Sequence, residues 1–252
     1  MKSVVTLNFK TEKDEALKLK SVLITGTDTG VGKTIVCRHL AAYMQSKGVN
    51  VITQKWVQTG VDQADDIKNH MLKPLPAWGE VQDIDDLRTP YRLKYPASPH
   101  LAAALEGVQI DIKIIEESHG LLCNHFDLVV VEGSGGGLVP LTEKILLADL
   151  VARLKMAVVI VIPNRLGCIN HALLTIEALR IREIKIMGLI FNRMNDTGDE
   201  TIMRENIRII SLISGVPVIG EIPFLEGNTD GFNRTKNVNE VFYKRWMEDK
   251  ND

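Results

Sequence analysis

The sequence predicts a single α/β domain with a mainly parallel sheet and helices on both faces of that sheet. Along the 252 residues, short β-branched runs alternate with longer amphipathic runs. This is the pattern of buried parallel strands joined by right-handed helical crossovers. The chain is 45% apolar and 25% charged, as in ordinary globular domains, and its length fits one domain of this class.

The predicted strands are the apolar runs at residues 22–25, 49–54, 128–131, 157–162, 186–191 and 216–219. The predicted helices cover residues 33–47, 111–123, 144–154, 170–181 and 199–214. Residues 57–99 lack this alternation and hold five of the nine prolines, so we expect a long active-site loop region with short helices there. We assign residues 1–20 to an N-terminal extension, an extra strand or arm, and residues 21–252 to the domain.

Charge and cysteine content argue against several classes of protein. The formal net charge is -2 and the basic residues are spread along the chain, which does not suit a nucleic-acid-binding surface. Cys37, Cys123 and Cys168 form no CxxC pair, so we expect reduced thiols of a cytoplasmic protein rather than disulfides or a zinc site. No apolar run reaches transmembrane length and the first twenty residues are too charged for a signal peptide, so no membrane contact is expected.

The stretch TGTDTGVGKT, residues 25–34, follows the first predicted strand and opens a helix. Five residues separate Gly26 from Gly32, one more than in G-x-x-x-x-G-K-[ST], but strand, glycine loop and helix occur in the required order. Such a loop directs backbone N–H groups toward phosphates, while Lys33 reaches the terminal phosphates and Thr34 can ligate magnesium. The sequence therefore predicts a P-loop NTPase-like fold. The alternative is an ordinary glycine turn.

Two further strand ends carry charged residues to the same rim of the predicted sheet. Lys55 leaves the second strand in TQKWVQTG, where it could hold an anion or stabilise developing charge. Glu132 leaves the third strand in VVVEGSGGGLVPL, whose glycines allow close backbone approach to a ligand. A glutamate there suits a magnesium ion beside phosphates. The alternatives are a strand-end lysine that extends into water and an exposed glutamate on a glycine turn.

Six stretches together carry a family resemblance: GTDTGVGKT, KWVQTG, SPHLAA, VEGSGGG, NRLGCINHA and FNRM. Their order and rough spacing, from about residue 21 to about residue 227, resemble those of the dethiobiotin synthetases. Trp56 stands where that family usually has a proline, and residues 1–20 have no counterpart. The resemblance implies three steps: carboxylation of one amine of 7,8-diaminopelargonic acid by CO2 (or bicarbonate), phosphorylation of the carbamate by ATP, and closure of a cyclic urea.

The resemblance also implies the site residues. Lys33 and Lys55 would be catalytic cations. The metal ligands for Mg²⁺ would be Thr34, Glu132 and one acid of QADDIKNH, either Asp65 or Asp66, with Asp66 favoured. ATP would contact Thr29, Gly30, Val31, Gly32, Lys33, Thr34, Ile35, Asp66, Glu132, Gly133, Ser134, Gly135, Asn192, Arg193, Pro223, Phe224 and Leu225. Asn192 would read the adenine edge, although an Asn at a strand-end turn is common. The substrate would contact Lys55, Thr59, Gly167, Cys168, Ile169 and Asn170.

The stretch NRLGCIN, residues 164–170, resembles the family's loop that crosses a dimer interface. The resemblance implies a homodimer in which backbone amides and Asn170 bind the substrate carboxylate in the neighbouring subunit. A monomer would leave Leu166 and Ile169 without an obvious core to bury them. The alternative is a helix-capping turn within one subunit.

Two other classes of protein are alternatives. Partition-type P-loop ATPases are switches that bind protein partners or membranes, but they usually carry a lysine where this chain has Thr27 and Asp28; the C-terminal stretch NEVFYKRWMEDKND is at best a weak membrane-tail candidate. A related amidotransferase would need an additional glutaminase domain. The histidines in predicted helices are expected to pack or face solvent, because no metal-ligand spacing joins them: His39, His100 and His171.

Overall fold

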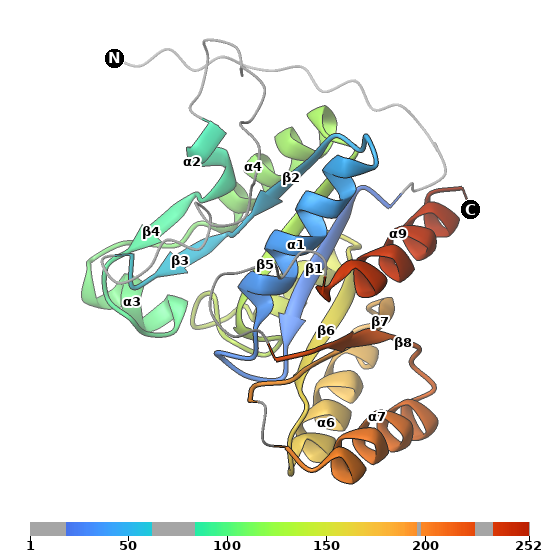
Figure 1. Ribbon diagram of the computed structural model, residues 1–252. Coiled ribbons are helices and arrows are strands. Elements are labelled where there is room, and N and C mark those ends of the chain that lie inside the picture. Colours follow the sequence, from blue (N-terminus) through green and yellow to red (C-terminus); the bar gives the residue numbers. More distant parts are fainter. Residues whose placement is uncertain (1–18, 62–83, 196–197, 225–233, 252) are drawn as a thin grey trace, which may run out of the picture.

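The main sheet of the computed structural model has six parallel strands in the order β2-β5-β1-β6-β7-β8 (Figure 1). The structure describes residues 19–61, 84–195, 198–224 and 234–251. The strands are β1 (Ser21–Gly26), β2 (Val51–Gln54), β5 (Leu128–Gly136), β6 (Ala157–Pro163), β7 (Ile186–Asn192) and β8 (Val218–Ile222). All six predicted strands are present, with ends that shift by a few residues. The predicted α/β fold with a parallel sheet is confirmed.

The five predicted helices are α1 (Lys33–Ser46), α4 (Ile112–His125), α5 (Leu147–Arg153), α6 (Cys168–Arg180) and α7 (Glu200–Ser214). Side-chain caps fix two of their starts. The Asp111 carboxylate accepts a hydrogen bond from the Lys113 amide at 2.9 Å at the start of α4. The Asp199 carboxylate accepts one from the Thr201 amide at 2.8 Å at the start of α7. These contacts satisfy amides that have no partner inside the helix.

Residues 62–83 lie outside the described residues, but the rest of the region 57–99 contains more regular structure than predicted. A second, two-stranded parallel sheet pairs β3 (Val57–Thr59) with β4 (Tyr91–Leu93), and the short helices α2 (Ile84–Arg88) and α3 (Pro99–Leu105) flank it (Figure 1). The expected short helices are therefore present, but the expectation of loop for 57–59 and 91–93 was wrong. Each of these strands has three residues, which is too short for hydrophobic periodicity to reveal.

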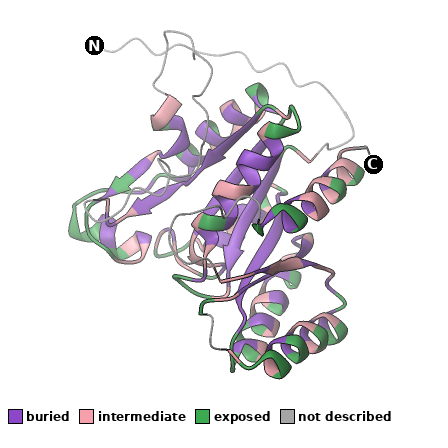
Figure 2. Cartoon of the chain, in the orientation of Figure 1, coloured by how far each residue is buried: buried purple, intermediate pink, exposed green. Residues whose placement is uncertain are grey.

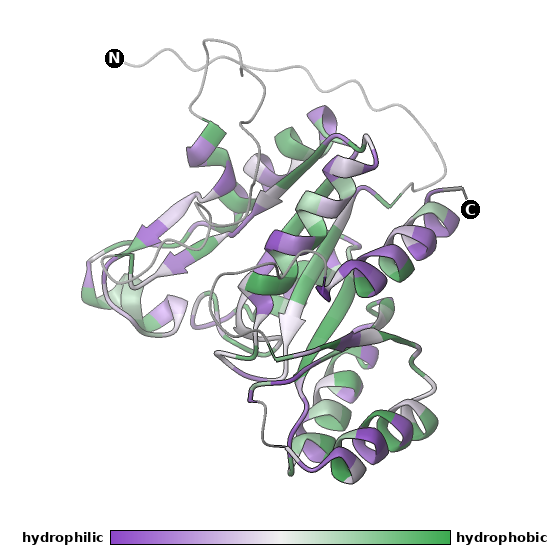
Figure 3. Cartoon of the chain, viewed as in Figure 1, coloured by the Kyte–Doolittle hydropathy of each residue, from purple (hydrophilic) through white to green (hydrophobic). Residues whose placement is uncertain are grey.

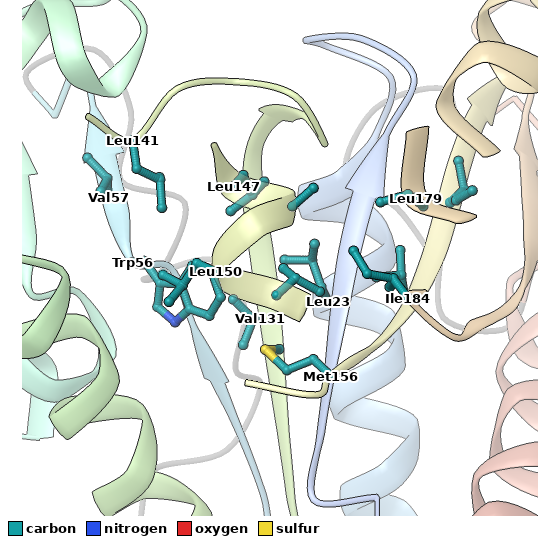
Figure 4. Close-up of a cluster of buried hydrophobic side chains, with 14 of the residues drawn as sticks. Leu23, Trp56, Val57, Val131, Leu141, Leu147, Leu150, Met156, Leu179 and Ile184 are labelled. Atoms are coloured by element: carbon teal, nitrogen blue, oxygen red, sulfur yellow. The ribbon is translucent and has the colours of Figure 1, made fainter. Parts of the chain in front are cut away.

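Both faces of the main sheet are buried (Figure 2). Helices α4, α5, α6 and α7 pack on one face, where the core includes Leu23 of β1 and the side chains shown in Figure 4. Helices α1 and α9 (Lys236–Asn251) pack on the other face, where the core includes Ile24 of the same strand. Since successive strand residues point to opposite faces, apolar side chains are needed on both, and the middle parts of the central strands are accordingly hydrophobic (Figure 3).

Helix α9 closes the second face of the sheet. Phe242 and Trp246 are fully buried there, and the Trp246 indole donates a hydrogen bond to the Leu19 carbonyl at 3.0 Å. The C-terminal stretch, a weak candidate for a membrane tail on its sequence, thus places Phe242 and Trp246 in the core. Among the described residues, no helix is both long and apolar enough to cross a membrane.

Candidate active site

The candidate site lies where three neighbouring strands, β2, β5 and β1, reach the carboxyl edge of the sheet. A cavity of about 720 Å³ opens there. It is lined by Thr29, Gly30, Gly32, Lys33, Thr34, Ile35, Lys55, Gln58, Thr59, Gly60, Pro96, Ala97, Ser98, Pro99, Glu132, Gly133, Ser134, Gly135 and Val139. The structure therefore brings together the predicted glycine loop, the strand-end lysine and the strand-end glutamate, as expected for ligand sites of open parallel sheets.

The glycine loop joins β1 to α1 in a conformation that requires glycine at two positions. Gly32, the residue before α1, has φ +100°, and a Cβ there would lie 2.2 Å from Nδ2 of Asn192. A Cβ on Gly26 would lie 2.5 Å from the Val31 side chain. Lys33, Thr34 and Ile35, the first residues of α1, line the cavity, and the start of a helix is a suitable site for an anion.

Two buried ammonium groups and one buried carboxylate meet in the cavity. Nζ of Lys55 lies 3.0 Å from Oε1 of Glu132, and the Thr34 hydroxyl donates to the same oxygen at 3.0 Å. Nζ of Lys33 donates to the Asp28 carbonyl at 2.8 Å, across the glycine loop. Two lysines against one glutamate leave a net positive charge, which suits a polyanionic ligand.

Burial lowers the pKa of Lys33 below its ordinary value of 10.5. The Glu132 carboxylate opposes this change, whereas the nearby charge of Lys55 adds to it. The Lys33 ammonium is thus poorly solvated and close to a second cation, so it gains from an anion that enters the cavity.

The donor set fits a magnesium ion in part. Thr34 and Glu132 present a hydroxyl and a carboxylate oxygen, the hard oxygen ligands that Mg²⁺ prefers. Both candidates for the third ligand, Asp65 and Asp66, lie outside the described residues. Within the described part of the chain, no group of three or more His, Cys, Asp or Glu residues could hold a metal on its own.

The residues predicted to bind the nucleotide base lie at the ends of β7 and β8. Asn192 is buried, and its Nδ2 donates to the Val31 carbonyl at 2.9 Å, so this side chain braces the glycine loop. Arg193 is held between Glu200 and Glu221, and these hydrogen bonds raise its pKa. Pro223 and Phe224 follow β8 and are half-buried, while Leu225 lies outside the described residues. Neither Asn192 nor Arg193 lines the cavity that holds the two lysines.

The residues predicted to bind the substrate fall into two groups. Lys55 and Thr59 line the cavity, but the four residues 167–170 do not. They form the start of α6, which begins at Cys168, two residues earlier than predicted, after Gly167 in a left-handed conformation with φ 88°. Ile169 is half-buried against the core, so the expectation that one subunit leaves it uncovered was wrong. Leu166 is 79% exposed, as expected.

Several cavity residues had no role predicted from the sequence. Pro96, Ala97, Ser98 and Pro99 come from the connection between β4 and α3, and their approach to the cavity depends on the β3–β4 pair. The stretch SPHLAA, residues 98–103, is one of those that resemble the family, and only this resemblance could have indicated a role for Ser98 and Pro99. Ser134 is also positioned by this small sheet, since its hydroxyl donates to the Val57 carbonyl at 2.7 Å.

His39, His100 and His171 lie in helices α1, α3 and α6, as predicted. The three cysteines are free thiols. The buried His119 of α4 had no predicted role. Burial lowers its pKa to about 4, and its Nδ1 lies 2.8 Å from Oε1 of Gln54.

Fold and site together define a P-loop nucleotide-binding protein. A family model described as an AAA domain matches residues 20–230. The fold is similar to that of a MinC:MinD cell division complex of Aquifex aeolicus (TM-score 0.58, 17% identity, 91% of this chain and 96% of that chain). It is also similar to a putative plasmid partition protein of Borrelia burgdorferi bound to AMPPNP (TM-score 0.54, 17% identity, 90% and 99%).

Sequence comparison narrows the class. The chain is 39% identical to an ATP-dependent dethiobiotin synthetase BioD of Chlorobaculum tepidum, over 88% of this chain and 92% of that protein. It is 36% identical to the BioD of Nitrosospira multiformis, over 81% and 88%. The chain belongs to the dethiobiotin synthetase family, and the resemblance that its motifs indicated is confirmed.

Proposed function

We propose that this protein, an ATP-dependent ligase of the dethiobiotin synthetase family, makes dethiobiotin from 7,8-diaminopelargonic acid, CO2 and ATP. The observation that carries this proposal is the convergence of Lys33, Lys55, Thr34 and Glu132 on one cavity. A carbamate oxygen is a weak nucleophile that must approach the negatively charged phosphates of ATP. Cations that gather the two reactants therefore address the main obstacle to the reaction.

Lys33 and the amides at the start of α1 are suited to the terminal phosphates of ATP. Lys33 belongs to the glycine loop and sits at the positive end of the helix. Its Asp28 carbonyl partner at 2.8 Å is neutral, so a phosphate oxygen would be a stronger partner in the same cavity. This lysine would hold the transferring group and stabilise the charge that develops on it.

Lys55 is suited to the carbamate. It enters the cavity from the neighbouring strand end, beside Thr59, and its ion pair with Glu132 holds the ammonium group in place. Lys55 and Thr59 would orient the carbamate toward the phosphate bound by Lys33. A magnesium ion held by Thr34, Glu132 and either Asp65 or Asp66 would supply further positive charge beside the phosphates.

The substrate carboxylate is assigned to a second subunit. Residues Gly167 to Asn170 do not line the cavity of their own chain, and the start of α6 offers amides suited to a carboxylate. We therefore propose a homodimer in which this segment, with Asn170, completes the partner's site. Asn192, Arg193, Pro223, Phe224 and Leu225 are proposed to surround the adenine, with Asn192 and Arg193 acting partly through the contacts that fix the strand ends.

ATP turnover with and without the diamine and bicarbonate tests the proposal. We expect ADP release to depend on both compounds, and a product with the mass of dethiobiotin. If the rate of ATP turnover does not depend on the diamine, the result would instead favour a partition-type switch. Similarity to partition and cell-division proteins at 17% identity reflects the shared fold and does not favour that activity.

A further inference from the structure

β2 is an edge strand of the main sheet, and the end of α2 covers the open side of its last residues. β2 is the outermost strand on its side, and β5 is its neighbour. On its open side, the Lys55 amide donates to the Arg88 carbonyl at 2.8 Å. Nε2 of Gln54 donates to the Leu87 carbonyl at 2.9 Å. The segment that carries Lys55 is thus fastened to the end of α2 rather than to another strand.

Arg88 adds two further bonds to the same segment through its side chain. Nε donates to the Thr53 carbonyl at 3.1 Å, and Nη2 donates to the Thr53 hydroxyl at 3.0 Å. Nη1 lies 3.1 Å from a carboxylate oxygen of Asp85, one turn earlier in α2. The Arg88 guanidinium therefore bonds Thr53, while the Arg88 carbonyl accepts from the Lys55 amide.

Arg88 is 5% exposed, and burying an arginine is costly unless its donors are well paired. A planar guanidinium can reach a carbonyl and a hydroxyl of one residue at once, which a lysine ammonium cannot do with the same geometry. On its other side, Lys55 is fixed by Glu132 at 3.0 Å. Glu132 thus holds the ammonium group of Lys55, and the end of α2 holds its backbone amide.

We propose that Arg88 is a positioning residue for Lys55, and that α2 fixes the reach of this lysine into the cavity through the Arg88–Thr53 grip. The inference rests on the proposed function, because it assumes that Lys55 orients the carbamate. Reactions that depend on oriented reactants lose about 100-fold in rate for a displacement near 1 Å. A loosened grip should therefore lower turnover without touching the glycine loop that holds ATP.

The test measures turnover, ATP affinity and thermal unfolding for Arg88→Lys, which keeps the charge but loses the fork. We expect kcat to fall about 10-fold or more, with the Kd for ATP within about twofold of wild type. Thr53→Val, which removes only the hydroxyl acceptor, should show a smaller loss in the same direction, and it carries the test if Arg88→Lys does not fold. Arg182→Lys is the matched control, because that guanidinium also bonds a carboxylate and a carbonyl but away from the cavity residues; its turnover should match wild type.

A double-mutant cycle separates positioning from general stability. Product is measured by mass over long incubations in a Lys55→Ala background. If Arg88 and Thr53 act through Lys55, Arg88→Lys and Thr53→Val should cause little further loss there. An equal loss in both backgrounds, or none in either, overturns the inference and leaves the proposed function standing. Full turnover by Lys55→Ala would overturn the role of Lys55 toward the carbamate and, with it, the inference about Arg88.

Discussion

At the scale of single residues, the proposed chemistry depends on two buried ammonium groups beside one carboxylate. Lys33 and Lys55 are 6% and 7% exposed, and Glu132 is 3% exposed. A like-charged pair of this kind is unfavourable without a counter-charge, and Glu132 supplies only one. The site is therefore arranged for a ligand that brings more negative charge, as ATP does.

Lys33→Ala should remove about 3 kcal/mol or more of transition-state stabilisation, the scale for loss of one preorganised electrostatic group. Its recorded partner is a loop carbonyl, so the folded structure should be nearly unaffected. Steady-state turnover and thermal unfolding check the two parts. Wild-type turnover in this variant would contradict the assignment of the phosphate loop.

Glu132→Gln should shift the magnesium requirement to higher concentration, because the amide keeps the shape but loses the charge that a hard cation needs. It should also lower kcat, since Lys55 loses the carboxylate at 3.0 Å that holds it. Activity titrated against magnesium measures both effects. Glu116→Gln, which alters a partly exposed ion pair with Arg153, is the control.

The same titration on Asp65→Asn and on Asp66→Asn separately identifies the third ligand. We expect Asp66→Asn to shift the magnesium requirement and Asp65→Asn to leave it unchanged. If Glu132→Gln has the same magnesium requirement as wild type, Glu132 does not have the proposed metal role.

At the scale of elements, the sequence predicts the strands and helices that have a strong hydrophobic period, and it misses the elements that form through contacts with distant segments. The six buried strands and five amphipathic helices could be read from the sequence, because burial on one or both faces dictates their residues. The glycine loop, Lys55 and Glu132 could also be placed at one edge, since parallel strands end together.

Other elements could not be derived in this way. The β3 and β4 strands gain their conformation from pairing with each other across more than thirty intervening residues. Helix α9 is polar on average and was not predicted, yet Phe242 and Trp246 anchor it in the core. The roles of Gln54, Arg88 and His119 arise from contacts between distant segments.

His119 links α4 to two strands and should make stability depend on pH. Its Nδ1 lies 2.8 Å from Oε1 of Gln54, which also accepts from Trp56, so the network assigns the proton of a neutral ring to Nδ1. Nε2 is then free to accept from the Ser21 hydroxyl at 3.2 Å. Protonation would place a charge in this buried network, and burial accordingly lowers the pKa of His119 from 6.5 to about 4.

The sign follows from the depressed folded-state pKa. The unfolded chain binds a proton near pH 6.5 and the folded chain only near pH 4, so the contribution is complete above pH 6.5 and is lost as the pH falls toward 4. Between pH 7 and pH 5, this histidine should cost about 2 kcal/mol of unfolding free energy. Urea unfolding at both pH values should show this loss in wild type, and a smaller loss in His119→Gln.

The control is His125→Gln, which alters an exposed histidine of the same helix. It should retain the wild-type pH dependence. If His119→Gln loses as much stability between pH 7 and pH 5 as wild type does, other groups cause the acid sensitivity and the role assigned to His119 is wrong.

At the scale of the whole molecule, one chain supplies the phosphate and carbamate side of the proposed site, and the proposed carboxylate side lies elsewhere on its surface. The start of α6 does not line the cavity, and Leu166, just before it, is 79% exposed. A two-fold partner could cover this leucine and bring the Gly167–Asn170 segment to the neighbouring cavity. This arrangement predicts a specific result when inactive subunits are mixed.

Asn170→Ala and Lys55→Ala subunits should each be nearly inactive as homodimers, because every site then lacks one essential group. When they are co-assembled in equal amounts, half of the dimers are mixed, and each mixed dimer has one site with both groups intact. About a quarter of wild-type activity should therefore return.

Subunit exchange is confirmed with two differently tagged chains, and Lys33→Ala mixed with Lys55→Ala is the control. Those two residues line one cavity of the same chain, so both sites of each mixed dimer lack one of them and no activity should return. A second comparison mixes wild type with a double variant that carries Asn170→Ala and Lys55→Ala in one chain. If the site is shared between subunits, the mixed dimers should have no intact site. If both residues serve their own subunit, each mixed dimer should have one intact site. Activity near a quarter of wild type supports the shared site, and activity near half rejects it.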